Sequence, residues 1–169
     1  MSGYTRPRPI RVTDDLRAFD SGHPMMDRWL RQRALANEAG RASRTFVTAP
    51  VSDPGTVVGY YALAAGSVGP GEVPGRVRRN MPRHIPVVVL ARLAVSLEHQ
   101  GRGLGSELLV DAAGRAVAAG IHVGVRAMVV HVLDTRAATF YERLGFVPAL
   151  PGGLTYVAAI DDLIRTLVR

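Results

Sequence analysis

The chain has 169 residues, the length of one ordinary domain, so we expect residues 1–169 to fold as a single domain. It has no cysteine, and all 21 of its basic residues are arginine. These absences exclude disulfides, thiolate metal ligands, a cysteine nucleophile, Schiff-base catalysis and the lysine of a Walker A phosphate loop.

The formal net charge is +7, and the excess of arginine lies mainly in residues 1–44 and 71–92. Patches of one sign attract polyanions and repel cations, although a generally basic proteome would give the same excess. The N-terminus has no apolar leader, and nowhere do 18 apolar residues run together. We therefore expect a cytoplasmic protein that does not insert into membranes.

The first half of the chain predicts helices followed by a hairpin. Helical spacing of apolar residues predicts helices over 14–19 and 24–39. Two β-rich segments, 44–48 and 56–64, are separated by the turn sequence Asp53-Pro54-Gly55, which indicates a hairpin. Residues 66–86 form a connection rich in Gly, Pro and Arg that is too long for a simple loop, so it is either mobile or functional.

The second half predicts strands alternating with helices. A near-continuous apolar strand over 86–95 precedes a helix over 106–119 and a strand over 125–133. Asp134 is a good N-cap for a helix that reaches Leu144, and a strand over 154–160 leads into a short amphipathic tail. This order predicts an α/β (α+β) domain with one mixed central β-sheet flanked by helices.

One segment, from Leu93 to Ser106, carries the clearest chemical signal. A strand ends, three glycines follow within five residues, and a helix begins. Glycines let backbone amides turn inward, and a helix N-terminus adds partial positive charge, so the segment predicts a phosphate site. A Rossmann fingerprint is poorly matched, since Leu108 stands where its third glycine belongs. The structural alternative is a turn that merely closes the corner between strand and helix.

Two motifs resemble those of the GCN5-related N-acetyltransferases (GNAT). Gln100-x-x-Gly103-x-Gly105 resembles their pyrophosphate loop, Q/R-x-x-G-x-G/A, and residues 134–146 are similar to their later helix, A-x-x-F-Y-x-x-x-G-F. The resemblance implies the GNAT fold and acetyl-CoA as co-substrate. It implies acetyl-CoA contacts at Leu93, Ala94, Val95, Gln100, Gly101, Arg102, Gly103, Leu104, Gly105, Ser106, Asp134, Ala137 and Phe140.

A narrower resemblance lies mostly in the N-terminal half. Residues 27–30, 37–40, 43–47, 59–63 and 91–95 are similar to the acetyltransferase toxins of bacterial toxin–antitoxin modules. This resemblance implies acetylation of the α-amine of aminoacyl-tRNA, which stops translation. It also implies a ribbon-helix-helix antitoxin as partner and a homodimer.

The GNAT resemblance makes Tyr141 the catalytic candidate, as the acid that protonates the departing CoA sulfur; the alternative is that Tyr141 only packs on a buried helix face. Transfer is expected to be direct, because no cysteine can carry an acyl intermediate. Residues 87–96 contain neither an acid nor a histidine, so no general base is evident on the central strand. An α-amine has a pKa of about 7.7–8.0, so it needs no strong base, and water or a distant acid remains open as proton acceptor.

Arginine contacts to phosphate are expected to bind the tRNA, although a solvated surface is the simpler explanation for any one side chain. The candidates are Arg41, Arg44, Arg76, Arg78, Arg79, Arg83 and Arg92. The five histidines are scattered without ligand spacing, so we expect no metal. Two other functions remain open: acetylation of a protein N-terminus or a small amine, and a basic nucleic-acid-binding module with a vestigial acetyl-CoA site.

Overall fold

The computed structural model describes residues 3–168, and the chain divides into two units. The first unit comprises Met1–Ala64 and Ala91–Asp111, and the second comprises Ala65–Leu90 and Ala112–Arg169. Three long elements contribute residues to both units: β3 (Gly59–Val68), β4 (Ile85–Val95) and α4 (Leu104–His122). Each unit is described below by itself.

Within residues 3–168, the strands form a seven-stranded sheet in the order β1-β2-β3-β4-β5-β7-β6. β4 pairs in parallel with β5, whereas β2 with β3 and β5 with β7 are antiparallel. The sheet is therefore mixed and flanked by helices, which confirms the predicted fold class.

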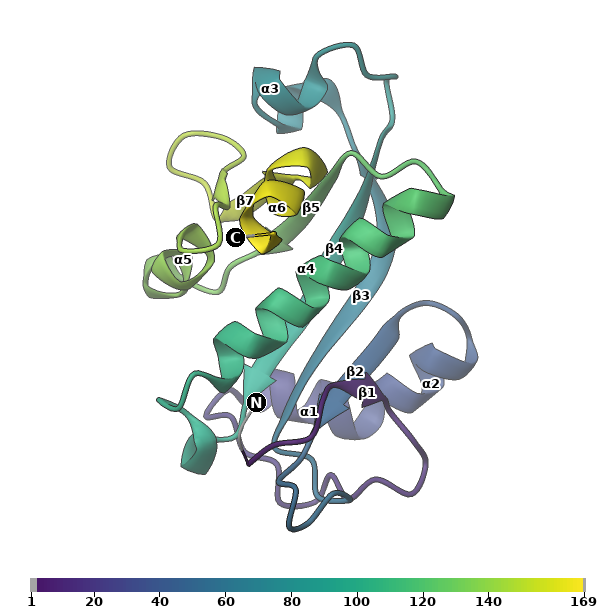
Figure 1. Cartoon of the computed structure of the whole chain (residues 1–169), viewed down its shortest axis with the longest axis vertical. Helices are drawn as coiled ribbons and strands as arrows, with labels where there is room; N and C mark the ends of the chain where they lie inside the picture. Colours follow the sequence, from purple (N-terminus) through teal and green to yellow (C-terminus); the bar gives the residue numbers. More distant parts are fainter. Residues whose placement is uncertain (1–2, 169) are drawn as a thin grey trace. The chain divides into compact units, whose positions relative to one another are not determined.

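The first unit begins with β1 (Arg8–Pro9), α1 (Pro24–Gln32), α2 (Ala34–Ala39) and β2 (Arg44–Thr48). The helix predicted over 24–39 is interrupted at Arg33, whose φ of −121° is not helical, so it forms two helices. α2 packs along β2 (Figure 1). Beneath these elements lies an apolar core that includes Leu30, Val47 and the fully buried Tyr60.

The prediction of a helix over residues 14–19 is wrong. Asp15 instead forms an isolated β-bridge with Thr56. The carboxylates of Asp14 and Asp15 accept hydrogen bonds from the backbone N–H groups of Arg11 and Arg17, respectively. Such local bonds from aspartate side chains stabilise turns in competition with a helix.

The hairpin prediction is confirmed, with Arg44 opposite Leu63 and Thr48 opposite Gly59. Its second strand, β3, begins three residues later than predicted and continues to Val68. The continuation is apolar in part, and it takes the first residues from the connection that we expected to begin at Gly66. The rest of that connection holds the short helices η1 (Pro70–Glu72) and α3 (Gly75–Arg78).

The second unit contains β5 (Ala127–His131), α5 (Thr135–Glu142), β6 (Val147–Pro148), β7 (Thr155–Ala159) and α6 (Ile160–Leu167). All but the two-residue β6 follow the predicted order. α6 packs against β7 (Figure 1). An apolar core cluster of this unit consists of valine, isoleucine and alanine side chains, among them Val77, Ile85 and Val129. Among the described residues, none of the helices combines the length and hydropathy that crossing a membrane requires.

Candidate functional site

In the first unit, the segment between β4 and α4 has the backbone that a diphosphate loop needs. After β4 come the short helix η2 (Leu97–His99) and two glycines in the left-handed region, Gly101 at φ 76° and Gly103 at φ 81°. A β-carbon at either glycine would meet no heavy atom within 4 Å. Glycine is therefore required here by the backbone conformation, while the space above the loop is open.

The first turn of α4 adds hydrogen-bond donors to this open space. The N–H of Glu107 bonds to the carbonyl of Gly103 at 3.1 Å, whereas the earlier N–H groups of a helix have no partner within the helix itself. Leu104 is buried and anchors the turn, while Ser106 is exposed. Ser106 borders a hollow of about 510 Å³ whose lining includes Glu107, Asp111 and Arg6, a residue that sequence reasoning missed. The N–H groups of the first turn, rather than this hollow with its two carboxylates, fit an anion such as a diphosphate.

Gln100 has a different role from the one its motif suggests. Its side-chain Nε2 donates to the carbonyl oxygens of Val95, at 2.8 Å, and Ser21, at 3.1 Å. These two bonds tie the loop to the end of β4 and to the segment before α1. Gln100 thus shapes the loop, and its side-chain donor is directed to the protein.

The end of β4 supplies the backbone that we expected to contact acetyl-CoA. Ala94 and Val95 are buried and Leu93 is half-buried. The register between β4 and β5 covers Val87 to Leu90, so the last residues of β4 extend past this pairing. Extended backbone of this kind offers N–H and C=O groups to an amide-bearing ligand.

In the second unit, α5 holds Tyr141 in a tightly packed position. The carboxylate of Asp134 caps the helix by accepting from the N–H of Ala137 at 2.9 Å. Tyr141 is only 7% exposed, and its ring meets the edges of Phe140 and Phe146 at centroid distances of 5.0 and 5.9 Å. Ala137 and Phe140 are half-buried on the same helix.

The turn after α5 explains the glycine and phenylalanine of the later motif. Gly145 takes a φ of 93°, and the N–H of Phe146 bonds to the carbonyl of Tyr141 at 3.3 Å. The turn thereby places Phe146 against the ring of Tyr141. Burial raises the pKa of Tyr141 to about 12, so the phenol keeps its proton throughout the neutral range.

The arginine candidates divide between the two units. In the first, Arg44 pairs with Glu38 at 3.3 Å, and the guanidinium of Arg92 lies 5.4 Å from the centre of the Trp29 ring. Arg41 is exposed at a positive φ of 61°.

In the second unit, Arg76 pairs with Asp162, and Arg78 donates to the carbonyl of Val73. Arg79 and Arg83 are exposed, and their guanidinium groups make no hydrogen bond or ion pair within the described residues. The Arg126 side chain, which sequence reasoning missed, donates to the carbonyls of Val77 and Arg76 and so fastens α3. Nothing in the pattern around Arg126 signals this role.

In the part of the chain from Gly3 to Val168, no three His, Asp or Glu side chains are grouped so that they could hold a metal ion.

Comparisons with known proteins point to one family. A family model described as an acetyltransferase (GNAT) domain matches residues 42–148, a range that includes both motifs. A tRNA-acetylating toxin of Mycobacterium tuberculosis is 53% identical over 146 residues, which cover 86% of each chain. The structure of AtaTR bound with AcCoA matches with a TM-score of 0.84 and 25% identity, covering 98% of each chain. AtaT complexed with acetyl-methionyl-tRNAfMet has the same fold, with a TM-score of 0.88 and 24% identity over 98% of this chain and 99% of that one.

Proposed function

Since the chain belongs to the GNAT acetyltransferases, we propose that it transfers the acetyl group of acetyl-CoA to the α-amine of an aminoacyl-tRNA and so stops translation. The observation that carries the proposal is the open glycine loop at the N-terminus of α4, which fits the diphosphate of CoA. The tRNA substrate is supported by the 53% identity to a tRNA-acetylating toxin. Because the family match takes in parts of both units, we assign residues 1–169 to one catalytic domain.

Acetyl-CoA supplies an activated acetyl thioester. The amides from Gly101 to Ser106 hold its diphosphate, with Gln100 keeping the loop in shape through Val95 and Ser21. Backbone groups of Leu93 and Val95 pair with the pantetheine arm. Asp134, Ala137 and Phe140 complete the contacts from α5.

The chemistry needs one nucleophile and one acid. The neutral α-amine attacks the thioester carbon, the carbon–sulfur bond breaks, and Tyr141 gives its proton to the departing sulfur. The amine loses a proton to water, and the Tyr141 phenolate regains one from water. Tyr141 is protonated at neutral pH, since burial raises its pKa to about 12, and the packing of its ring fixes the position of the donor.

The acceptor explains why β4 needs no carboxylate or histidine. An α-amine has a pKa of about 7.7–8.0, whereas a lysine side chain has one of about 10.4. An appreciable fraction of the aminoacyl-tRNA amine is therefore neutral at pH 7. Because their amines have a higher pKa and are almost entirely protonated at pH 7, lysine side chains and polyamines are expected to be poor acceptors.

Exposed arginines bind the tRNA backbone through its phosphates. Arg41, Arg79 and Arg83 have no bond that competes for their guanidinium groups within the described residues. Such contacts give affinity without reading base sequence. As a toxin, the protein is further proposed to act in the cytoplasm as a homodimer and to be neutralised by a ribbon-helix-helix antitoxin.

The test is incubation of the purified protein with labelled acetyl-CoA and either a charged or a deacylated tRNA pool. Label in the charged pool alone is the expected result. Label on a protein N-terminus or on a small amine would replace the proposal with another acetyltransferase function. Binding of tRNA without any consumption of acetyl-CoA would favour a nucleic-acid-binding module.

A further inference from the structure

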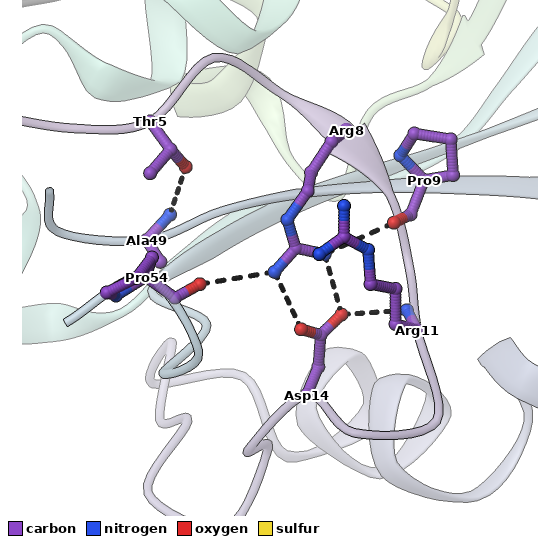
Figure 2. Close-up of polar contacts among 7 residues, drawn as sticks. All are labelled: Thr5, Arg8, Pro9, Arg11, Asp14, Ala49 and Pro54. Atoms are coloured by element: carbon purple, nitrogen blue, oxygen red, sulfur yellow. Dashed lines mark hydrogen bonds and ion pairs between the residues drawn. The ribbon is translucent and has the colours of Figure 1, made fainter.

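The N-terminal arm, residues 4–11, is fixed along the edge of the first unit. β1 pairs with β2, with Arg8 opposite Val47. Upstream of β1, the N–H of Thr5 donates to the carbonyl of Ala49 at 2.8 Å, and the N–H of Ala49 donates to Oγ1 of Thr5 at 3.1 Å. The second of these bonds is drawn in Figure 2.

A partly buried ion pair fixes the middle of the arm. The guanidinium of Arg8 donates to both carboxylate oxygens of Asp14, at 2.7 and 2.9 Å, and to the carbonyl of Pro54 at 3.1 Å (Figure 2). The Asp14 side chain is only 3% exposed. Burial acts to raise the pKa of Asp14, but the hydrogen bonds from Arg8 and from the Arg11 amide outweigh it, and the pKa is lowered. Two interactions thus fix the backbone at Tyr4. One is the hydrogen bond of the neighbouring Thr5 to Ala49, and the other is the β-bridge that Tyr4 itself forms with Pro50.

From this fixed position, Tyr4 contacts the segment between β4 and α4, residues 96–103, at two points. This segment is called the diphosphate loop below. Its hydroxyl lies 2.9 Å from Nδ1 of His99, and its ring meets the His99 ring edge-on at 5.6 Å. Nη1 of Arg102 donates to the same hydroxyl at 3.3 Å. Because the phenol oxygen accepts from Arg102, its own proton is available to the imidazole nitrogen. One hydroxyl therefore joins the residues on both sides of Gln100 and Gly101.

We propose that Tyr4 is a positioning residue that holds the diphosphate loop ready for acetyl-CoA. This inference rests on the proposed function, in which the loop binds the diphosphate. Gly101 and Gly103 make the loop costly to order, and Gln100 fixes only its beginning. Tyr4 fixes the next stretch in advance, so less conformational entropy is lost when the ligand binds.

The choice of a phenol also suits an anionic ligand. A carboxylate in this place would neutralise the Arg102 guanidinium and repel the diphosphate. The neutral hydroxyl orients Arg102 and leaves its full positive charge for the ligand. Arg102 thus becomes the loop's charged contact, and Tyr4 acts through it.

The test is Tyr4→Phe, which removes the hydroxyl and keeps the ring. Three quantities are measured: amide hydrogen exchange over residues 97–106 in the ligand-free protein, the Kd for acetyl-CoA by calorimetry, and kcat at saturating acetyl-CoA. We expect faster exchange in this segment and a Kd weakened by about fivefold, with kcat at saturating acetyl-CoA unchanged within about twofold. Unchanged exchange or an unchanged Kd overturns the inference.

Two further variants separate positioning from general packing. Thr5→Val removes the side-chain acceptor for Ala49 but keeps the backbone bond from Thr5 to Ala49 that fixes the chain beside Tyr4, so we expect it to lower the melting temperature without changing the Kd. An equal loss of affinity in Thr5→Val would mean that the arm matters only for packing. In a double-mutant cycle, Tyr4→Phe should have a smaller effect on the Kd when Arg102 is already replaced by Met; additive effects would contradict action through Arg102.

The outcomes also distinguish this inference from the proposed function. If the wild-type protein fails to bind acetyl-CoA, the proposed function is wrong, and the role of Tyr4 in binding is lost with it. If the wild type binds and Tyr4→Phe binds equally well, only the inference about Tyr4 is wrong.

Discussion

In the first unit the candidate binding groups are backbone amides on an exposed loop, whereas in the second the candidate acid is one phenol buried among aromatic rings. The loop is held by hydrogen bonds from Gln100 to the carbonyl of Val95 and from Arg102 to the hydroxyl of Tyr4. Tyr141 keeps its position through Phe140 and Phe146. The difference follows from the two tasks, since an anion must reach free N–H groups, whereas a proton donor needs a fixed position and burial keeps the phenol in its protonated form. If this division is correct, binding and turnover can be damaged separately.

The largest effect is expected from Tyr141→Phe in the second unit. Phenylalanine keeps the ring contacts but has no proton to give, so kcat should fall by about 10³-fold. The Kd for acetyl-CoA and the melting temperature should stay close to those of the wild type. Kinetics and calorimetry on the same preparation provide the check; a Kd weakened as much as kcat falls would mean that Tyr141 serves binding.

The next largest effect should come from Gly103→Asp in the first unit. An aspartate at φ 81° is strained and places a negative charge beside the diphosphate, so affinity for acetyl-CoA should fall by about 10²-fold. Gly114→Asp is the matched control, since it adds the same charge within α4 at a position where a β-carbon has open space. Normal binding by Gly103→Asp would show that the loop is not the diphosphate site.

A smaller loss is expected when the arm of the first unit is released. Arg8→Gln leaves the buried Asp14 carboxylate without its charged partner and should lower the free energy of unfolding by about 2 kcal/mol. Because the pKa of Asp14 is lowered by folding, its pairing stabilises the wild type above the ordinary value of 3.8, and this contribution is lost as the pH falls below it. Urea unfolding of the wild type and of Arg8→Gln at pH 7 and pH 3 measures the loss of stability and its dependence on pH. Equal free energies of unfolding for the wild type and Arg8→Gln at pH 7 would mean that the ion pair contributes nothing.

The dependence of kcat/KM on pH tests the role of Tyr141 in the second unit through a smaller effect. Between pH 7 and pH 9 the rate should rise by about six- to tenfold, as the α-amine of the substrate, with a pKa of about 7.7–8.0, loses its proton. No decline from Tyr141 should follow in this range, because its pKa is about 12. Initial rates on charged tRNA check this, and a decline that begins near pH 8 and is absent from Tyr141→Phe would contradict the assignment.

The smallest effects should come from single arginines on the surface. Arg79→Ala and Arg83→Ala should each raise the KM for tRNA by about threefold and reduce the slope of log KM against log salt by about one. Arg76→Ala is the comparison within the same unit, because its guanidinium already pairs with Asp162. A larger effect from Arg76 than from Arg79 and Arg83 together would show that free guanidinium groups do not mark the tRNA surface.

The sequence predicted best the elements whose signals are local. The apolar run over 86–95, the Asp134 cap and the Asp53-Pro54-Gly55 turn all depend on neighbouring residues, and the structure forms the corresponding elements. The same locality misled the prediction for 14–19, where Asp14 and Asp15 bond to nearby backbone and form turns.

Within the candidate site, the motifs predicted which residues belong to the site more accurately than they predicted the role of each residue. Gln100 belongs to the loop motif, but its side chain bonds to Ser21, 79 positions away. Tyr4 meets His99 across 95 positions, which no periodicity or spacing could reveal. Long-range contacts of this kind depend on how the chain folds back on itself, so they are visible only in the structure.

The most direct measurement is the location of the acetyl group after reaction with charged tRNA. Nuclease digestion releases the 3′-terminal adenosine with its amino acid, and mass spectrometry then identifies the modified atom. The account predicts N-acetyl-aminoacyl-adenosine with the wild type and almost none with Tyr141→Phe. Acetyl groups on nucleobases, or an unmodified aminoacyl-adenosine while acetyl-CoA is consumed, would contradict it.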